Sequence, residues 1–218
     1  MMRPLMHQAG DTAVQFRQAA AEDAPQAVPL IHSSGPGAFD YVFAVPGHGD
    51  AQAFLRQAFV DGAGEFGWRN HVVGELDGAV VAVGAGFGGD TKWPFTLAAA
   101  RQILGHYGWR HAGGVIVRGL RVETVIPPPT GAMHYLAHLA VTPTLRGHGI
   151  GQALIHHLLA QARELGRQQI VLDVASSNPA AERLYARLGF EVSGERASRL
   201  VNAQGRVPDH RRMQCRLD

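Results

Sequence analysis

The sequence contains a single cysteine, Cys215, and no uninterrupted apolar run approaches the roughly 18 residues that a transmembrane helix needs. One thiol cannot build an internal disulfide framework, so a packed core must hold the fold, as is typical of a reducing compartment. The first residues also lack the sustained apolar segment of a signal peptide. These absences predict a cytoplasmic protein without a membrane segment.

Neither sign of charge is in large excess, because the sequence has 20 Lys and Arg residues and 18 Asp and Glu residues, for a formal net charge of +2. Nucleic-acid-binding proteins usually concentrate positive charge on one face. Six arginines do gather near the C-terminus, but acidic and apolar residues alternate with them, which is typical of a solvated sheet face. They are Arg196, Arg199, Arg206, Arg211, Arg212 and Arg216. No nucleic-acid partner is predicted.

Metal-binding motifs are missing despite 12 histidines. The chain has no H-E-x-x-H pair and no cysteine cluster. His156 and His157 are adjacent on a predicted helix and so point in different directions, while His134 and His138 share a predicted strand face with no third ligand to name. We therefore predict no metal site.

Apolar residues make up 46% of the 218 residues, which is enough for one well-packed core. The length indicates one domain rather than two. We expect a flexible leader over residues 1–11 and a single domain over residues 12–218, with an insertion at about 90–132. The insertion is expected either to line a substrate cleft or to form a peripheral element that packs or dimerises.

Periodicity and turn signals predict the order of the elements. The expected strands are 12–19, 71–74, 79–87, 133–141, 168–175 and a hairpin of 191–200 with 207–217. A first helix is expected after Asp23, to be ended or kinked at Pro29. Further helices are expected over 50–61, over 94–104 with Gly105 as its stop, and from Ile150 and from Pro179 onward. Residues 34–40 are expected to form a loop, and 115–126 could be strand or helix. Strict alternation along 133–141 would place His134 and His138 on the face opposite Tyr135 and Leu139.

The most informative stretch runs from Leu139 to Gly151 and has the sequence LAVTPTLRGHGIG. Pro143 cannot continue a strand, and glycines then follow in the spacing R-x-x-G-x-G before a helix. Such a turn directs free N–H groups and a helix dipole at one point, which suits a phosphate or pyrophosphate. A plain tight turn is the simpler alternative. The P-loop is excluded because no Lys-Ser/Thr pair follows, and the dinucleotide fingerprint has a different glycine spacing.

A second motif lies downstream, where Asn178, Ala181, Tyr185, Gly189 and Phe190 fall in the spacing N-x-x-A-x-x-x-Y-x-x-x-G-F. Together, in this order, the two motifs resemble the GNAT superfamily of acyl-CoA-dependent N-acetyltransferases. The resemblance covers residues 133–195, and the first half of the chain agrees only in pattern. It implies an α+β fold of three layers, with a mixed, mostly antiparallel sheet, splayed central parallel strands and helices on both faces.

The resemblance also implies acetyl-CoA as co-substrate, with the glycine loop on its pyrophosphate and the end of strand 133–141 paired to its pantetheine arm. The residues that it places on acetyl-CoA are Leu139, Ala140, Val141, Arg146, Gly147, His148, Gly149, Ile150, Gly151, Asn178 and Tyr185. His148 would contribute only its backbone. A backbone N–H near Leu139 would stabilise the oxyanion.

Acyl transfer to an amine needs a base for the amine and an acid for the departing thiolate. The resemblance assigns the acid to Tyr185. Many family members carry a basic carboxylate on the strand that corresponds to residues 133–141, and this sequence has none there. The candidates for the base are Tyr135 and His138, followed by His134 and Glu123, and a chain of water molecules is an equal alternative.

The sequence therefore predicts an N-acetyltransferase that moves an acetyl group from acetyl-CoA to a primary amine of a small molecule or a protein, by direct attack in a ternary complex. One alternative is a sensor that binds acyl-CoA without transfer, which the missing carboxylate favours and Tyr185 opposes. A structural or nucleic-acid-binding role for the arginine-rich C-terminal hairpin is a second alternative. A homodimer is the expectation from the family.

Overall fold

The computed structural model describes residues 7–9 and 12–217, in which eight strands form one mixed sheet in the order β1-β2-β3-β4-β5-β6-β8-β7. The strands are β1 (His7–Ala9), β2 (Thr12–Gln18), β3 (His71–Leu76), β4 (Ala79–Gly88), β5 (Met133–Val141), β6 (Gln169–Ala175), β7 (Glu191–Arg196) and β8 (His210–Arg216). Only β5 and β6 pair in parallel. Of the predicted leader, residues 7–9 form β1, and residues 1–6 and 10–11 lie outside the described residues.

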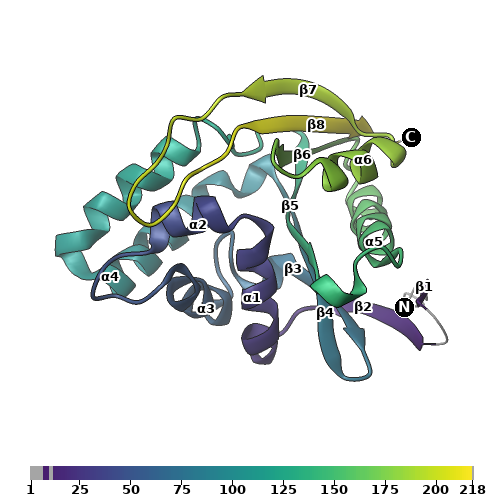
Figure 1. Ribbon diagram of the computed structural model, residues 1–218, viewed down its shortest axis with the longest axis horizontal. Helices are drawn as coiled ribbons and strands as arrows, with labels where there is room; N and C mark the ends of the chain where they lie inside the picture. Colours follow the sequence, from purple (N-terminus) through teal and green to yellow (C-terminus); the bar gives the residue numbers. More distant parts are fainter. Residues whose placement is uncertain (1–6, 10–11, 218) are drawn as a thin grey trace.

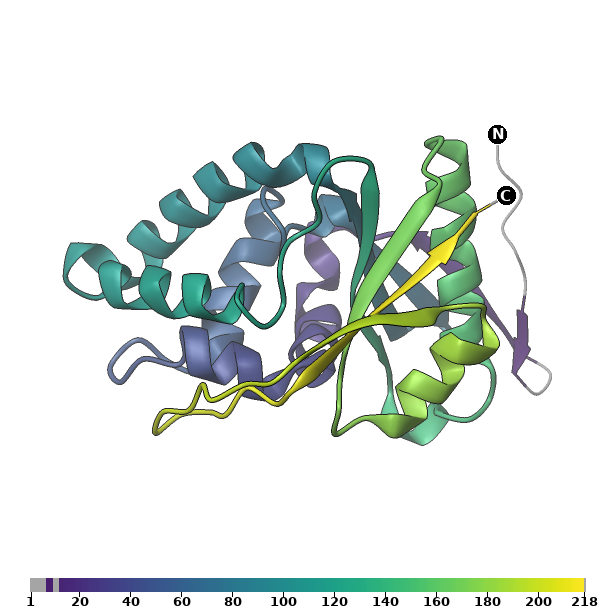
Figure 2. The same ribbon diagram turned by 90° about the horizontal axis from the view of Figure 1, so that it is seen from above.

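Helices cover both faces of this sheet. They are α1 (Ala24–Ser34), α2 (Pro36–Phe43), α3 (Ala51–Asp61), α4 (Lys92–Val122), α5 (Ile150–Glu164) and α6 (Pro179–Arg187). One buried cluster packs the four helices α1, α2, α3 and α4 on one face of β3, β4 and β5. A second buried cluster packs α5 and α6 on the opposite face of the sheet. Figures 1 and 2 show the two groups of helices flanking the strands. The predicted three-layer α+β fold is confirmed.

Local signals account for the elements that were predicted correctly. Asp77 and Gly78 have φ angles of 51° and 78°, which is the left-handed backbone that a tight β3–β4 turn requires. The Asp50 carboxylate accepts the backbone N–H of Ala53 at the start of α3. The Asn178 side chain accepts the N–H of Ala181 at the start of α6 in the same way.

Two helix boundaries were predicted wrongly, and at a third the structure excludes one of the two predicted alternatives. α1 does not end at Pro29 but continues to Ser34, because burial of its apolar face outweighs one lost hydrogen bond. Residues 36–43, which lie mostly in the predicted loop, form α2, with Pro36 at its first position. Gly105 does not stop α4; the break comes at Gly108, where φ is 64° and ψ is 170°. The two arms of α4 fold back on each other there (Figure 2).

The central parallel pair is short. Met133, His134 and Tyr135 pair with Gln169, Ile170 and Val171, after which β5 and β6 diverge. Side chains join the strands at the point of divergence. The hydroxyl of Tyr135 donates to the Asp173 carboxylate over 2.9 Å, and Arg212 on β8 donates to the same carboxylate over 2.7 Å.

A bulge in β5 overturns the predicted alternation of its side chains. Ala85 of β4 pairs with Ala137 and Val83 pairs with Ala140, so β5 carries one extra residue opposite Gly84. His138 takes up the extra length with a left-handed backbone, at a φ of 56°. Its ring consequently lies on the same face as Ala137, whereas Leu139 moves to the α5 face, where its side chain covers Gly84.

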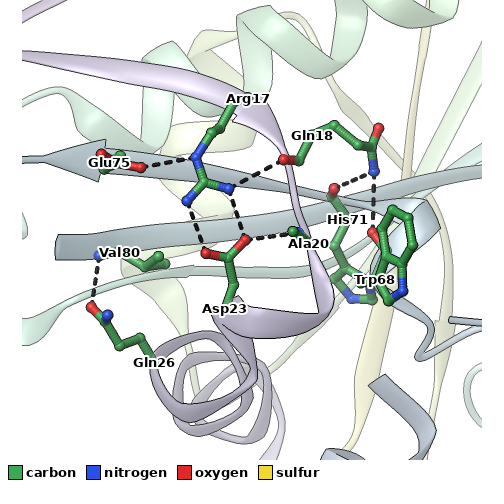
Figure 3. Close-up of polar contacts among 9 residues, drawn as sticks. All are labelled: Arg17, Gln18, Ala20, Asp23, Gln26, Trp68, His71, Glu75 and Val80. Atoms are coloured by element: carbon green, nitrogen blue, oxygen red, sulfur yellow. Dashed lines mark hydrogen bonds and ion pairs between the residues drawn. The ribbon is translucent and has the colours of Figure 1, made fainter. Parts of the chain in front are cut away.

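The joint between β2 and α1 depends on one arginine. Arg17 donates two hydrogen bonds to Asp23 at 2.7 and 2.8 Å and a third to Glu75 at 2.8 Å. Asp23 also accepts the backbone N–H of Ala20, as Figure 3 shows. Asp23 therefore closes the turn into α1, and its carboxylate makes no capping hydrogen bond with the first turn of that helix.

Gly84 is closely packed beneath the bulge, because a Cβ there would lie 2.9 Å from Leu139 Cδ2 and 3.0 Å from Leu158 Cδ1. Gly84→Ala should lower the free energy of unfolding by about 1–3 kcal/mol, through overpacking against the bulge. Urea denaturation measures the change. Gly113→Ala is the matched control, since the same methyl group meets no atom within 4 Å on α4. A Gly84→Ala protein as stable as the control would show that the bulge is not packed in this way.

Candidate functional site

A cavity of about 1550 Å³ lies where β5 and β6 diverge. One end is formed by the glycine loop between β5 and α5, with the start of α6 beside it. The other end is formed by α2, α4 and the turn between α3 and β3. The cavity therefore connects the predicted phosphate cradle with the helices of the first half of the chain.

The glycine loop has the geometry of an anion site. Gly147 and Gly149 have φ angles of 83° and 82°, a backbone that favours glycine at both positions. The first hydrogen bond of α5 runs from Ala153 to the carbonyl of Gly149. The preceding N–H groups have no partner within the helix, and they point with the positive end of its dipole toward the loop. These residues fit a pyrophosphate.

The structure brings most of the predicted acetyl-CoA residues together. Those that line the cavity are Leu139, Ala140, Val141, Arg146, Gly147, Gly149, Gly151, Asn178 and Tyr185. Two do not line it. Ile150 is buried in the core beneath α5, and the ring of His148 turns back to the Arg146 carbonyl, 3.0 Å away. The guanidinium of Arg146 donates to the carbonyl of Val141.

Tyr185, the predicted acid, lies on α6 and is buried against the cavity wall. Burial raises the pKa of its hydroxyl to about 12. The side chain therefore keeps its proton throughout the neutral range, which is the state that a proton donor needs.

Tyr135, a candidate base, also lines the cavity. Its hydroxyl donates to Asp173, and burial together with the charge of that carboxylate raises its pKa well above the ordinary value. The phenol is held in its protonated form. Asp173 in turn is paired with Arg212, and its side chain is only 1% exposed.

His138, the other leading candidate, lines the cavity from the bulge. Its Nε2 lies 3.5 Å from Oε1 of Glu65, and its Nδ1 lies 3.0 Å from Nε2 of His71. The ring stacks on Phe66, with 5.3 Å between centroids. His138 therefore presents one nitrogen to an acidic wall of the cavity and the other to a buried histidine.

The remaining candidates for the base are placed differently. His134 is buried on the face of β5 opposite Tyr135, outside the cavity lining. Burial, and then the positive charge of Arg167, lower its pKa to about 4. Glu123 lies at the cavity rim, where the loss of surrounding water and then the charge of Glu65 raise its pKa.

Three residues of this site were not singled out from the sequence. Asp173 interrupts the apolar strand sequence QIVLDVA, and this lone charge was the available signal. Glu65 and His71 flank a glycine-containing turn that carries no recognisable motif. The contact of His71 with His138 depends on a β-bulge, which sequence periodicity does not reveal.

The predicted insertion contributes to the cavity. α4 lines it from both of its arms, with residues that include Lys92, Phe95, Ile103, Val115 and Ile116. Arg118 donates to the backbone carbonyl of Val42. The hydroxyl of Tyr107 donates to the backbone carbonyl of Phe43 over 2.6 Å. These bonds attach α4 to the end of α2.

Two features are absent from the part of the chain that the structure describes. Within 7–9 and 12–217, no group of three or more His, Cys, Asp and Glu residues is arranged to hold a metal ion. Over the same ranges, no helix combines the length and apolar character needed to cross a membrane.

Comparisons with known proteins agree with this architecture. A model of the acetyltransferase (GNAT) family matches residues 52–190. An uncharacterised N-acetyltransferase of Mycobacterium bovis is 38% identical over 65 residues, which are 30% of this chain and 42% of that protein. The chain thus spans less than half of the length of the curated relatives that it matches.

Two solved structures have a similar fold. A crystal structure of an acetyltransferase aligns with a TM-score of 0.67 at 21% identity, over 93% of this chain and 99% of the other. A phosphinothricin acetyltransferase from Sinorhizobium meliloti, in complex with acetyl-CoA, aligns with a TM-score of 0.55 at 20% identity, over 94% and 88% of the two chains.

The buried neutral His134 predicts a pH dependence of stability. Its pKa of about 4 in the folded state lies below the ordinary histidine value of 6.5. The unfolded chain therefore binds the proton first, and stability falls as pH drops from 6.5 toward 4. In His134→Leu, the fall in the free energy of unfolding on acidification should be smaller than in the wild type by on the order of 3 kcal/mol. Urea denaturation at pH 7 and pH 4.5 measures it.

Between pH 7 and pH 9 the two proteins should change in stability by the same amount, because His134 is neutral in both the folded and the unfolded chain there. An unaltered acid slope in His134→Leu would show that the imidazole is charged or hydrated in the folded protein.

Proposed function

The chain belongs to the GNAT family of acetyltransferases, and we propose that it transfers the acetyl group of acetyl-CoA to a primary amine of a small molecule or a protein. One observation carries the proposal: the cavity between the diverging strands joins an anion-binding loop at one end to His138 and Glu65 at the other. Tyr185 lies in the wall of the same cavity.

Acetyl-CoA would supply the thioester and the leaving thiolate. The N–H groups at the start of α5 would bind its pyrophosphate, and Arg146 would add a positive charge. Because β5 has no ladder partner beyond Tyr135 on the β6 side, its backbone from Leu139 to Val141 is available to pair with the pantetheine arm. Asn178, at the start of α6, faces the same part of the cavity.

The amine must be neutral to attack, and His138 is the group best placed to take its proton. Tyr135 holds its own proton on Asp173, and His134 lies outside the cavity lining. The amine nitrogen forms a bond to the acetyl carbon, and the backbone N–H near Leu139 stabilises the resulting oxyanion. The carbon–sulfur bond then breaks, and Tyr185 donates its proton to the thiolate.

The acceptor would enter from the side of α4 and α2. Phe39, Phe66 and Phe95 give this end of the cavity an apolar wall, and Glu65 gives it a negative charge that favours an amine. We therefore propose that residues 90–132, which include α4, form an acceptor wall within a single domain of residues 12–218. A homodimer and a cytoplasmic location stay predictions from the sequence.

Binding at the loop is tested by Gly151→Glu against the isosteric Gly151→Gln. A Cβ at this position would meet Leu184 and Val141 at 3.5 Å and 3.7 Å, so both side chains start from an ordinary contact. The Glu carboxylate would repel the pyrophosphate, and Kd for acetyl-CoA should rise at least about tenfold above that of Gly151→Gln. Calorimetric titration measures both. Equal affinities would place the pyrophosphate elsewhere.

The role of Tyr185 is tested by Tyr185→Phe, with Tyr41→Phe as a control at a buried tyrosine outside the cavity lining. Loss of the proton donor should lower kcat on the order of 100-fold, and Kd for acetyl-CoA should change by less than about threefold. Release of CoA thiol reports turnover. If Tyr185→Phe and Tyr41→Phe both turned over at the wild-type rate, Tyr185 would not be the acid.

A further inference from the structure

Two histidines from different strands contact each other beside the cavity, and the mechanism above uses only one of them. His71 Nε2 lies 3.0 Å from His138 Nδ1, and the rings are within 10° of parallel. β4 separates their strands, and its residue between them is Ala85, whose small side chain leaves room for both rings. His71 is 0% exposed, so it cannot touch a substrate.

The atoms around the pair determine where the protons lie. His71 Nδ1 is 2.9 Å from the carbonyl oxygen of Gly67, which can only accept, so this nitrogen carries a proton. Burial, and then the proximity of His138, lower the pKa of His71 to about 3, so the ring is neutral at neutral pH. Its Nε2 is therefore an acceptor, and the hydrogen bond between the rings is donated by His138 Nδ1.

A neutral His138 that donates from Nδ1 has its lone pair on Nε2. This is the nitrogen that faces Glu65, and both residues line the cavity. The opposite tautomer would point the lone pair at His71, where no substrate reaches. The ionisable groups in contact with His138 among the described residues are His71 and Glu65, and α2 and the turn before β3 present Phe39 and Phe66.

We propose that His71 is a positioning residue, which holds His138 in the Nδ1–H tautomer so that Nε2 takes the proton of the attacking amine. Glu65 then accepts a hydrogen bond from the newly formed Nε2–H. His71 keeps its own proton on the Gly67 carbonyl throughout, so one proton moves, from the amine to His138. The proposal rests on the role of His138 as the base in the proposed function.

The turn between α3 and β3 carries both outer partners of the histidine pair: Glu65, which faces His138, and Gly67, whose carbonyl accepts from His71. A Cβ on Gly67 would lie 2.3 Å from the carbonyl carbon of Gly62, so the turn requires glycine there. The side chain of Gln18 donates to the His71 carbonyl at 2.7 Å and to that of Trp68 at 3.1 Å (Figure 3). The backbone that positions the His71 ring is thus fixed from the neighbouring strand.

His71→Phe keeps a ring of similar size and removes the acceptor nitrogen. With a saturating amine substrate of the wild type, kcat should fall on the order of 10- to 100-fold, while Kd for acetyl-CoA stays within about threefold. In His71→Phe, the ascending limb of the pH profile of kcat should disappear or lie at a different pH from that of the wild type. His157→Phe is the matched control, because it replaces another buried histidine. His157 lies on α5, packs against Phe16 of β2 and does not line the cavity.

Nitrogen-15 NMR of histidine-labelled wild type tests the tautomer without any variant. The expected spectrum shows neutral His138 protonated at Nδ1 alone, and His71→Phe should convert it to a mixture of tautomers. A wild-type His138 protonated at Nε2 would overturn the proposal, and so would His71→Phe turning over like His157→Phe. If the wild type acetylates no amine, the proposed function fails while the tautomer measurement still decides the arrangement of the two rings.

Discussion

A buried hydrogen-bonded ion pair joins the sheet where its two parallel strands part, and the site depends on that junction. β5 and β6 share three residue pairs, after which the Asp173 carboxylate, held by Tyr135 and Arg212, links β5, β6 and β8. Removing one partner would leave a buried charge unpaired, which costs far more than a surface ion pair does. Arg212 also donates to the carbonyl of Pro127, so the same cluster anchors the segment that follows α4.

The second irregularity is the bulge at His138, and it gives the two faces of β5 different tasks. Before the bulge, Tyr135 and Ala137 face the cavity; after it, Leu139 packs on Gly84 toward α5. Without the extra residue, regular alternation would carry the ring of His138 away from Glu65 and His71. A left-handed backbone at a non-glycine residue costs on the order of 1 kcal/mol or more, and it is retained at functional sites when surrounding packing fixes it.

The sequence was most informative where chemistry depends on the backbone. The glycines of the loop, the cap at Asn178 and the Asp77–Gly78 turn each require particular residue types, so local sequence revealed the order of elements and the end of the cavity that the glycine loop forms. The opposite end, at Glu65 and His138, is built from tertiary contacts instead. Nothing local to Glu65 or His71 signals that they meet a ring displaced by a bulge, and the helical path of residues 36–43 and past Gly105 was decided by packing rather than propensity.

The central claim is that the cavity performs transfer rather than binding alone. The most direct measurement is release of CoA thiol from acetyl-CoA in the presence of polyamines, arylalkylamines, aminosugars, amino acids and peptide N-termini, with mass spectrometry of the products. The account predicts that at least one class yields CoA and acetylated amine in equal amounts, at a rate that Tyr185→Phe lowers. Saturable binding of acetyl-CoA with no thiol release above the enzyme-free rate in every class would contradict it and favour a sensor.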